Sequence, residues 1–424
     1  MTRIFSLPTV TAISAAIAAA LSAPAMAGGL SLNEQSASGM GTAYAGRASS
    51  ALDASTVFGN PAGMSRLKAQ ASGGFAFIDA NIDIKNASGA GTGTNKGDMV
   101  PFKTIPFGYY VNPLNDDWHF GIGLYAPFGG DADYESTFQG RYKGTTTQIQ
   151  VVTVQPTLSY RINDRVSVGA GPTISRIDGT LGFNLDTTLL GGGDAEVESS
   201  GHDYGVGYNI GVIADVTDNT TVGLTYRSKT DFELRGETKA RNLPPAGAGL
   251  GLINGDYRGK LDFTAPETAE LSVTHRLTDQ WTLHGGAVWT RWDRLDRIVI
   301  NNSGAVGALE QLNEEVQWRN TWAYAVGASY QVNPNWVLRA GVALDEAPAT
   351  NEFRSVRTPY GNRKVVSLGA GWSPTQHLTV DVAYAYLRES EADVNQPTEN
   401  LRPGYAATYE TEAHGLSAQF TYKY

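Results

Sequence analysis

Apolar and polar residues alternate with a period of two over long stretches of the 424-residue chain. Residues 148–162 and 204–216 follow this pattern, and residues 316–330 set aromatic and aliphatic side chains against small and polar ones. The end of the chain repeats it, with one face formed by Leu416, Ala418, Phe420, Tyr422 and Tyr424. A period of two is typical of strands with a single apolar face. The pattern therefore predicts an all-β protein.

Two kinds of all-β protein use such strands. A soluble sandwich buries the apolar faces between two sheets, whereas an outer-membrane barrel turns them toward lipid. The connections between the strands favour the barrel. Six short polar breaks lie at residues 112–117, 163–165, 217–219, 278–280, 333–335 and 373–376. Seven longer connections, rich in Gly or charge, lie near residues 85–103, 127–144, 178–203, 235–256, 301–315, 346–363 and 388–410.

These connections predict a 14-stranded antiparallel transmembrane β-barrel with short turns on one rim and long loops on the other, as in bacterial outer membranes. Both termini then lie on the periplasmic, short-turn side. Trp118, Trp281 and Trp336 each follow a short turn, where an interfacial aromatic girdle is expected. The alternative for these Trp residues is the core of a soluble sandwich.

The first 66 residues do not alternate. Arg3, an apolar stretch at 4–21 and the small residues at 25–27 predict a signal peptide over residues 1–27. Residues 28–66 are rich in Gly, Ala and Ser. A barrel of this width has a lumen that side chains alone do not fill, so we expect 28–66 to lie inside as a hatch and 67–424 to form the barrel. A disordered periplasmic tail is the alternative for 28–66.

Composition excludes several functions. The chain has no Cys, so a disulfide framework, a thiolate metal site and a cysteine nucleophile are ruled out. A formal net charge of -10 disfavours binding to a phosphate backbone. The six His residues show no metal-ligand spacing. The sequence therefore predicts no nucleic-acid partner, no metal and no cofactor.

One segment near the start resembles a known family. Residues 32–39 read LNEQSASG, and residues 60–64 read NPAGM. Together with Gly41, Tyr44, Gly46 and Asp53, these residues resemble the mature start of the outer-membrane long-chain fatty acid transporter (FadL) family, which includes uptake proteins for toluene and xylene. The resemblance implies an amino-terminal hatch of short helices whose motif residues are Asn33, Glu34, Asn60, Pro61 and Ala62.

The third predicted strand contains a break at Ala126, Pro127, Phe128, Gly129 and Gly130. Proline removes a donor from the hydrogen-bond ladder, and glycine has no side chain to pack. The resemblance implies an inward kink here that opens a lateral gap in the wall beside Asn60–Ala62. The alternative is that Pro127 begins an extracellular loop.

The expected cargo is hydrophobic. An acyl tail of ~16 carbons prefers an apolar pocket to water by about 12 kcal/mol, so release must avoid returning it to water. A carboxylate head group needs a cation, and a guanidinium can bind both of its oxygens. Strand phase places Arg319 and Arg227 on the inward face, and the resemblance puts Arg319 at a ligand-contacting family position. Arg388 lies near another basic family position, although it follows the outward phase of its strand or already belongs to a loop. Inward Glu270 could instead pair with an Arg in a lumen network.

We therefore expect a non-enzymatic outer-membrane transporter that binds hydrophobic compounds, foremost long-chain fatty acids, in the lumen and releases them laterally at the third strand. The alternatives are an uptake channel for aromatic hydrocarbons, a general diffusion porin, and an outer-membrane hydrolase. Outer-membrane lipid and lipopolysaccharide are the expected surroundings, and a monomer is the expected state.

Overall fold

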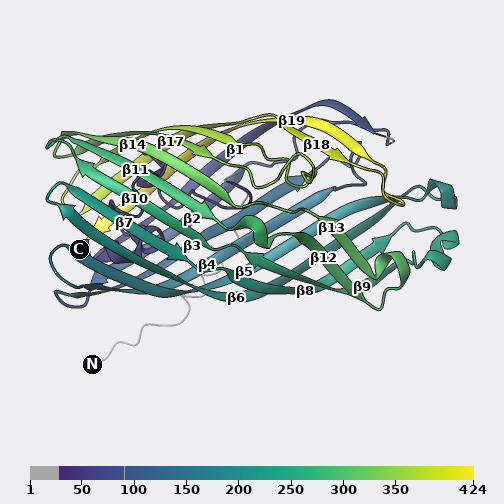
Figure 1. Ribbon diagram of the computed structural model, residues 1–424, viewed down its shortest axis with the longest axis horizontal. Helices are drawn as coiled ribbons and strands as arrows, with labels where there is room; N and C mark the ends of the chain where they lie inside the picture. Colours follow the sequence, from purple (N-terminus) through teal and green to yellow (C-terminus); the bar gives the residue numbers. More distant parts are fainter. Residues whose placement is uncertain (1–27, 90) are drawn as a thin grey trace.

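The structure is a computed structural model that describes residues 28–89 and 91–424. The predicted signal peptide lies outside the described residues. The strands form one closed antiparallel sheet, because β1 (Gln70–Gly89) pairs with β2 (Lys103–Pro113) on one side and with β19 (Tyr405–Lys423) on the other. Figure 1 shows the resulting barrel, with short turns at one end and longer loops at the other.

The described residues contain 19 strand segments. Five strands are each split by a kink into two segments, namely β7/β8, β9/β10, β11/β12, β13/β14 and β17/β18, which leaves 19 − 5 = 14 strands. The remaining segments are β3 (Trp118–Asp133), β4 (Thr146–Arg161), β5 (Val166–Asp186), β6 (Asp194–Thr217), β7 (Thr220–Arg227), β8 (Thr230–Arg241), β9 (Gly255–Ala265), β10 (Thr268–Arg276), β11 (Trp281–Thr290), β12 (Arg297–Ser303), β13 (Gln311–Glu315), β14 (Thr321–Asn333), β15 (Trp336–Asp345), β16 (Arg363–Trp372), β17 (Leu378–Glu389) and β18 (Ala392–Gln396).

The two-residue period has its expected structural meaning. On β6, Val206, Ile210 and Val212 are exposed on the outer face. On β4, polar side chains are buried on the inner face, and these are Thr153, Gln155, Thr157 and Ser159. Trp118, Trp281 and Trp336 begin β3, β11 and β15 and are exposed, which places them at the short-turn rim as predicted.

The six short turns were predicted correctly, but several strands run further than expected. The connection predicted near 178–203 shrinks to residues 187–193, because β5 and β6 remain paired from Gly179–Gly201 out to Asp186–Asp194. Likewise β3 continues through Asp133, and β18 lies inside the connection predicted near 388–410. These outer segments keep their interstrand hydrogen bonds although their exposed faces are polar. The polar sequence was therefore mistaken for a loop.

The hatch contains three short helices, α2 (Ala37–Met40), α3 (Thr56–Gly59) and η1 (Pro61–Arg66). They contact strands on different sides of the barrel, α2 against β16 and β17 and η1 against β4, β5 and β6. In Figure 1 they lie within the barrel, in the half nearer the short turns. Residues 28–66 are therefore packed in the lumen rather than forming a free tail.

Wall glycines make room for the hatch. A Cβ atom on Gly223 of β7 would lie 1.9 Å from the carbonyl oxygen of Ala48, and one on Gly341 of β15 would lie 2.2 Å from Thr42. Contacts this short with backbone atoms cannot be relieved by a side-chain rotation. The backbone of the hatch thus packs directly against the backbone of the wall at these glycines.

The substitution Gly223→Leu is expected to displace the hatch and to raise ion conductance in planar bilayers, because the new side chain overlaps the Ala48 backbone. The barrel should still fold, which heat-modifiable migration in gels would report. Gly285→Leu is the matched control, since a Cβ there meets no atom within 4 Å. Unchanged, low conductance of a folded Gly223→Leu barrel would contradict the role of residues 28–66 as a plug.

Candidate functional site

The barrel wall has a window between β2 and β3. These strands pair only from Pro113–His119 to Gly108–Leu124. Beyond Leu124, β3 keeps its pairing with β4 but not with β2, and a bulge lies between Tyr125 and Phe128. At the outer end of the window, Lys103 of β2 forms a nearly buried ion pair with Asp131 of β3. The unpaired edges are therefore bounded at both ends.

The break in β3 coincides with the predicted segment Ala126–Gly130. All five residues are buried, so this stretch has no lipid-exposed face. Its free edge pairs with the hatch instead of with β2: the Leu32 amide donates to the Pro127 carbonyl, and the Gly129 amide donates to the Leu30 carbonyl, both at 2.9 Å. The alternative that Pro127 begins a loop is wrong, because β3 continues to Asp133.

An apolar cluster lies behind the window. It joins Leu32 and Met40 of the hatch to Ile105 of β2, Ala126 of β3 and Ile78 of β1. Met40 and Ile78 also line the first of two internal spaces that flank the hatch segment 30–34. The window is thus closed from inside by hatch side chains rather than by strand pairing.

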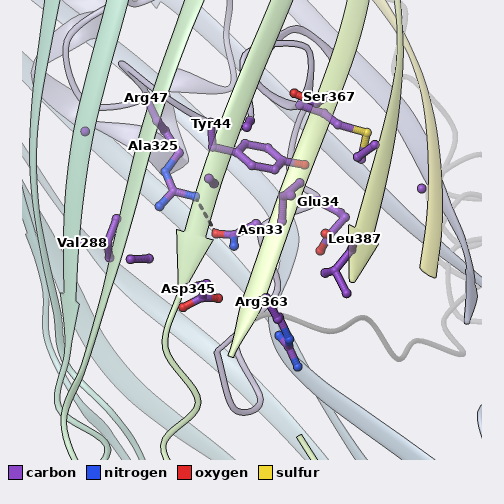
Figure 2. A pocket seen from close by; sticks show the side chains of 18 of the residues that line it. Asn33, Glu34, Tyr44, Arg47, Val288, Ala325, Asp345, Arg363, Ser367 and Leu387 are labelled. Carbon is purple, nitrogen blue, oxygen red and sulfur yellow. Dashed lines mark hydrogen bonds between the residues drawn. The ribbon is translucent and has the colours of Figure 1, made fainter. Parts of the chain in front are cut away.

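We call the first internal space the hatch chamber, because residues of the hatch and of the wall line it together. Figure 2 shows it between the hatch and the wall. Most of its lining is apolar or small. Its lining residues include Asn33, Glu34, Met40, Tyr44, Arg47, Ile78, Glu270, Val288, Ala325, Asp345, Arg363, Ser367 and Leu387.

The charges of the hatch chamber form two groups. Arg47 of the hatch pairs with Glu270 of β10 at 2.8 Å and donates to the side-chain oxygen of Asn33 at 3.1 Å, the bond drawn in Figure 2. On the other side, Arg363 at the start of β16 donates through Nε to Glu389 at 2.6 Å, with both side chains 1% exposed.

The Arg363–Glu389 group is not saturated. Among the described residues, Nη1 and Nη2 of Arg363 have no hydrogen-bond partner, and neither has Oε2 of Glu34 nor the hydroxyl of Tyr44. Buried polar atoms are normally paired, so such a concentration around one cavity is unusual. Burial raises the pKa of the Glu34 carboxyl to about 7, against lowering by backbone hydrogen bonds and by Arg363. The chamber can therefore offer two cationic donors beside an acid that titrates near neutrality.

The second space, which we call the wall chamber, lies on the other side of Leu30 and is more apolar. It is lined by strands β4, β5, β6, β8, β9 and β12 together with the segment around Trp318. Its apolar lining residues are Leu30, Ile149, Ile177, Leu181, Leu234, Leu261, Phe263, Leu295, Ile298, Ile300, Val316 and Trp318. The space suits an apolar group larger than a single methyl.

The predicted ligand residues have different fates. Glu270 faces the lumen and pairs with a hatch arginine, which is the network alternative. Arg227 also faces the lumen, but it donates to the Phe58 carbonyl at 2.6 Å and its guanidinium lies 4.1 Å from the Phe58 ring, so it anchors the hatch. Arg388 is exposed on the outward phase of β17, as strand phase indicated, and lines neither chamber.

The inward placement of Arg319 was wrong. Gln317, with a positive φ of 37°, lies in the irregular segment 316–320 that precedes β14. Val316 and Trp318 on either side of it both pack inward in a cluster with Leu30, while Arg319 is exposed and lines neither chamber. The alternation resumes only at Thr321.

The hatch motif residues hold the hatch in place. The Asn60 side chain accepts from the Ala62 amide at 3.1 Å and donates to the carbonyls of Ala48 at 2.7 Å and of Val212 at 2.9 Å. Pro61 follows as the first residue of η1. Asn60 thus caps a helix and ties it to β6, while Asn33 and Glu34 line the hatch chamber.

Sequence reasoning missed Arg47 and Arg363. Arg47 stands in the aperiodic segment, and Arg363 stands at the end of the predicted connection 346–363, so strand phase gave no signal for either. Their only local signal is charge within a segment otherwise predicted to be small or polar. In the described part of the chain no group of three or more His, Asp or Glu residues could hold a metal ion, and no helix there is long and apolar enough to cross a membrane.

Comparisons with known proteins agree with this geometry. The family model described as outer membrane protein transport protein (OMPP1/FadL/TodX) matches residues 18–424. The long-chain fatty acid transport protein of Escherichia coli O6:H1 is 26% identical over 441 residues, which cover 97% of each chain. A solved Pseudomonas aeruginosa FadL homologue is 25% identical with a TM-score of 0.86, covering 93% of this chain and 99% of that one. The Ralstonia pickettii toluene transporter TbuX, 18% identical with a TM-score of 0.65 and covering 91% and 97%, has the same fold.

Proposed function

The chain belongs to the outer membrane transport family of OMPP1, FadL and TodX, and from this premise we propose that it takes up long-chain fatty acids through the wall of its barrel. As a member it is an outer-membrane β-barrel transporter of hydrophobic compounds and not an enzyme. The proposal adds the cargo and the route: binding in the two chambers, then lateral release through the window between β2 and β3.

The window is the observation that carries the route. An apolar tail stabilised by about 0.8 kcal/mol per methylene leaves a pocket slowly into water but readily into lipid. Between β2 and β3 the wall has no strand pairing beyond Gly108–Leu124, and hatch residues 30–32 together with the apolar cluster around Leu32 and Met40 close this gap from inside. Movement of the hatch segment 30–34 would therefore connect both chambers with the bilayer and spare the tail any contact with water.

The polar atoms of the hatch chamber favour a carboxylated cargo over an aromatic hydrocarbon. A hydrocarbon would leave Nη1 and Nη2 of Arg363 unpaired, whereas a carboxylate accepts both hydrogen bonds. The 26% identical relative is named for long-chain fatty acid transport. We also propose that the chain ends face the periplasm, because Tyr424 donates to Ala69 at the short-turn rim.

Uptake and conductance together test the proposed function. Cells that have this protein as their only uptake route are expected to accumulate radiolabelled hexadecanoate. The purified protein is expected to conduct little ion current in planar bilayers, because the hatch fills its lumen. Uptake of toluene but not of hexadecanoate would favour the aromatic alternative. A large steady conductance with no uptake of either compound would favour a diffusion porin.

A further inference from the structure

A row of glycines crosses the wall beside the wall chamber. Gly179 of β5 pairs with Gly201 of β6, Gly201 pairs with Gly236 of β8, and Gly236 pairs with Gly259 of β9. Four neighbouring strands therefore place glycine at the same level. One strand further, Ile149 of β4 pairs with Gly179.

These glycines face the lumen. Gly179 shares the phase of buried Ile177, Gly236 that of buried Leu234, and Gly259 that of Phe263, all members of the inward apolar cluster around Leu30. Gly179, Gly201 and Gly259 line the wall chamber directly. The absence of four side chains at one level makes a trough in the inner wall, about 14 Å long across three strand spacings.

The hatch does not explain this row. Glycines elsewhere in the wall touch hatch backbone, as Gly223 and Gly341 do. By contrast, a Cβ on Gly179 or Gly259 would meet wall side chains, namely Leu234 and Thr238, each at 3.0 Å. Gly236 faces a backbone restriction, because its Cβ would lie 1.9 Å from the Ser200 carbonyl oxygen. For Gly179 and Gly259, neither hatch packing nor backbone approach requires glycine.

The edges of the trough suit an apolar guest. One edge is formed by Ile177, Leu234 and Leu261. The other edge carries the hydroxyls of Ser199 and Thr238, which bond to each other at 2.8 Å, and Thr238 donates onward to Asn302 at 2.6 Å. Every hydroxyl in this chain of bonds has a partner, so this edge adds no unsatisfied polar group to the trough.

From these contacts we propose that the glycine row binds the apolar tail of the cargo and limits the length of tail that the protein accepts. The proposal rests on the proposed function and adds the specificity-determining residues Gly179, Gly201 and Gly259, which line the wall chamber. A tail lying across β5, β6, β8 and β9 runs along the wall, perpendicular to the strands, and touches the glycine backbone. Glycine in a strand is a usual place for such close approach of a ligand.

The test is a binding series with saturated fatty acids of increasing length on detergent-purified protein carrying Gly179→Leu or, separately, Gly259→Val. Each methylene kept out of the trough should weaken binding about fourfold. We therefore expect at least about a tenfold loss for the 16-carbon acid and little change for the 8-carbon acid. His202→Leu is the matched control, because His202 is exposed next to Gly201 on the outer face.

Two results would overturn the proposal. Unchanged affinity for every length in both folded glycine variants would show that the tail does not lie here, while wild-type binding would leave the proposed function standing. Equal losses for short and long acids would likewise exclude a length limit. If the wild-type protein binds no fatty acid of any length, the proposed function fails and the trough fails with it.

Discussion

A chain carrying both Ser31→Cys and Phe128→Cys is expected to lose uptake when oxidised and to regain it when reduced. Ser31 lies opposite Phe128 in an antiparallel bridge between the hatch and the kinked part of β3. The flanking bonds run from Leu32 to Pro127 and from Gly129 to Leu30, so this is a pair without mutual hydrogen bonds, with Cα atoms about 4.5 Å apart. That separation fits a disulfide.

The physical reason is that segment 30–34 separates the two chambers and backs the window. A covalent bond to β3 would fix the segment in its present position. The apolar cluster that contains Leu32 and Met40 would then keep the window between β2 and β3 closed. We expect uptake of hexadecanoate to fall to the level of cells lacking the protein, and a thiol reductant to restore most of it. The natural chain has no Cys, so no competing disulfide can form.

The control places the same bond where no movement is proposed. Ala370 and Val382 pair across β16 and β17 in the wall, so Ala370→Cys with Val382→Cys should leave uptake unchanged in both redox states. The single Phe128→Cys variant separates the effect of the bond from loss of the Phe128–Trp292 aromatic contact. Normal uptake by a fully oxidised Ser31–Phe128 pair would show that this segment need not move.

The sequence predicted the barrel because turns and the two-residue period are local signals. Strand number followed from the breaks near Asn163, Asn333 and their counterparts, and those breaks are where the structure turns. The window could be expected from Pro127 and Gly130 for the same reason, since each acts through its own backbone. What the sequence could not provide was the partner that replaces β2, which is hatch residue Leu30, almost a hundred positions away.

The binding residues were harder to predict because they depend on register and on where a strand becomes regular. The predicted strand phase does not extend through the irregular segment 316–320, so Trp318 packs into the lumen and Arg319 is turned away from it. The glycine row is invisible in any one strand, because it appears only when four strands are aligned. Arg363 was hidden by its position in a predicted loop, although it is among the most buried side chains of the described residues.

Binding of a fatty acid is expected to weaken about tenfold between pH 6 and pH 8, while binding of the corresponding alcohol stays constant. The hatch chamber is lined by Arg47 and Arg363 and by the acids Glu34, Glu270 and Asp345, while Glu389 pairs with Arg363. An incoming carboxylate on Arg363 would add to this negative charge. It is therefore tolerated best when Glu34, whose pKa is raised to about 7, carries a proton.

The sign follows from that raised pKa. Below pH 7 the Glu34 carboxyl is mostly neutral and the anion binds well; above pH 7 it becomes charged and repels the anion. The fatty acid carboxyl, with an ordinary pKa of about 4 to 5, stays ionised throughout this range. Glu34→Gln should remove the pH dependence and keep the affinity found at low pH, because the amide cannot ionise. A Glu34→Gln protein with the wild-type pH profile would assign the titration to another group.

Replacing the Arg363–Glu389 pair tests the cation in this scheme. The double change Arg363→Met with Glu389→Gln avoids leaving a buried carboxylate without its partner, so the barrel should fold. Loss of hydrogen bonds to a charged group should weaken hexadecanoate binding by about 10- to 100-fold and leave hexadecan-1-ol binding nearly unchanged. The ratio of the two affinities is the decisive quantity, since a general disturbance of the chamber would lower both. Equal losses for the acid and the alcohol would show that Arg363 supports the chamber without holding the head group.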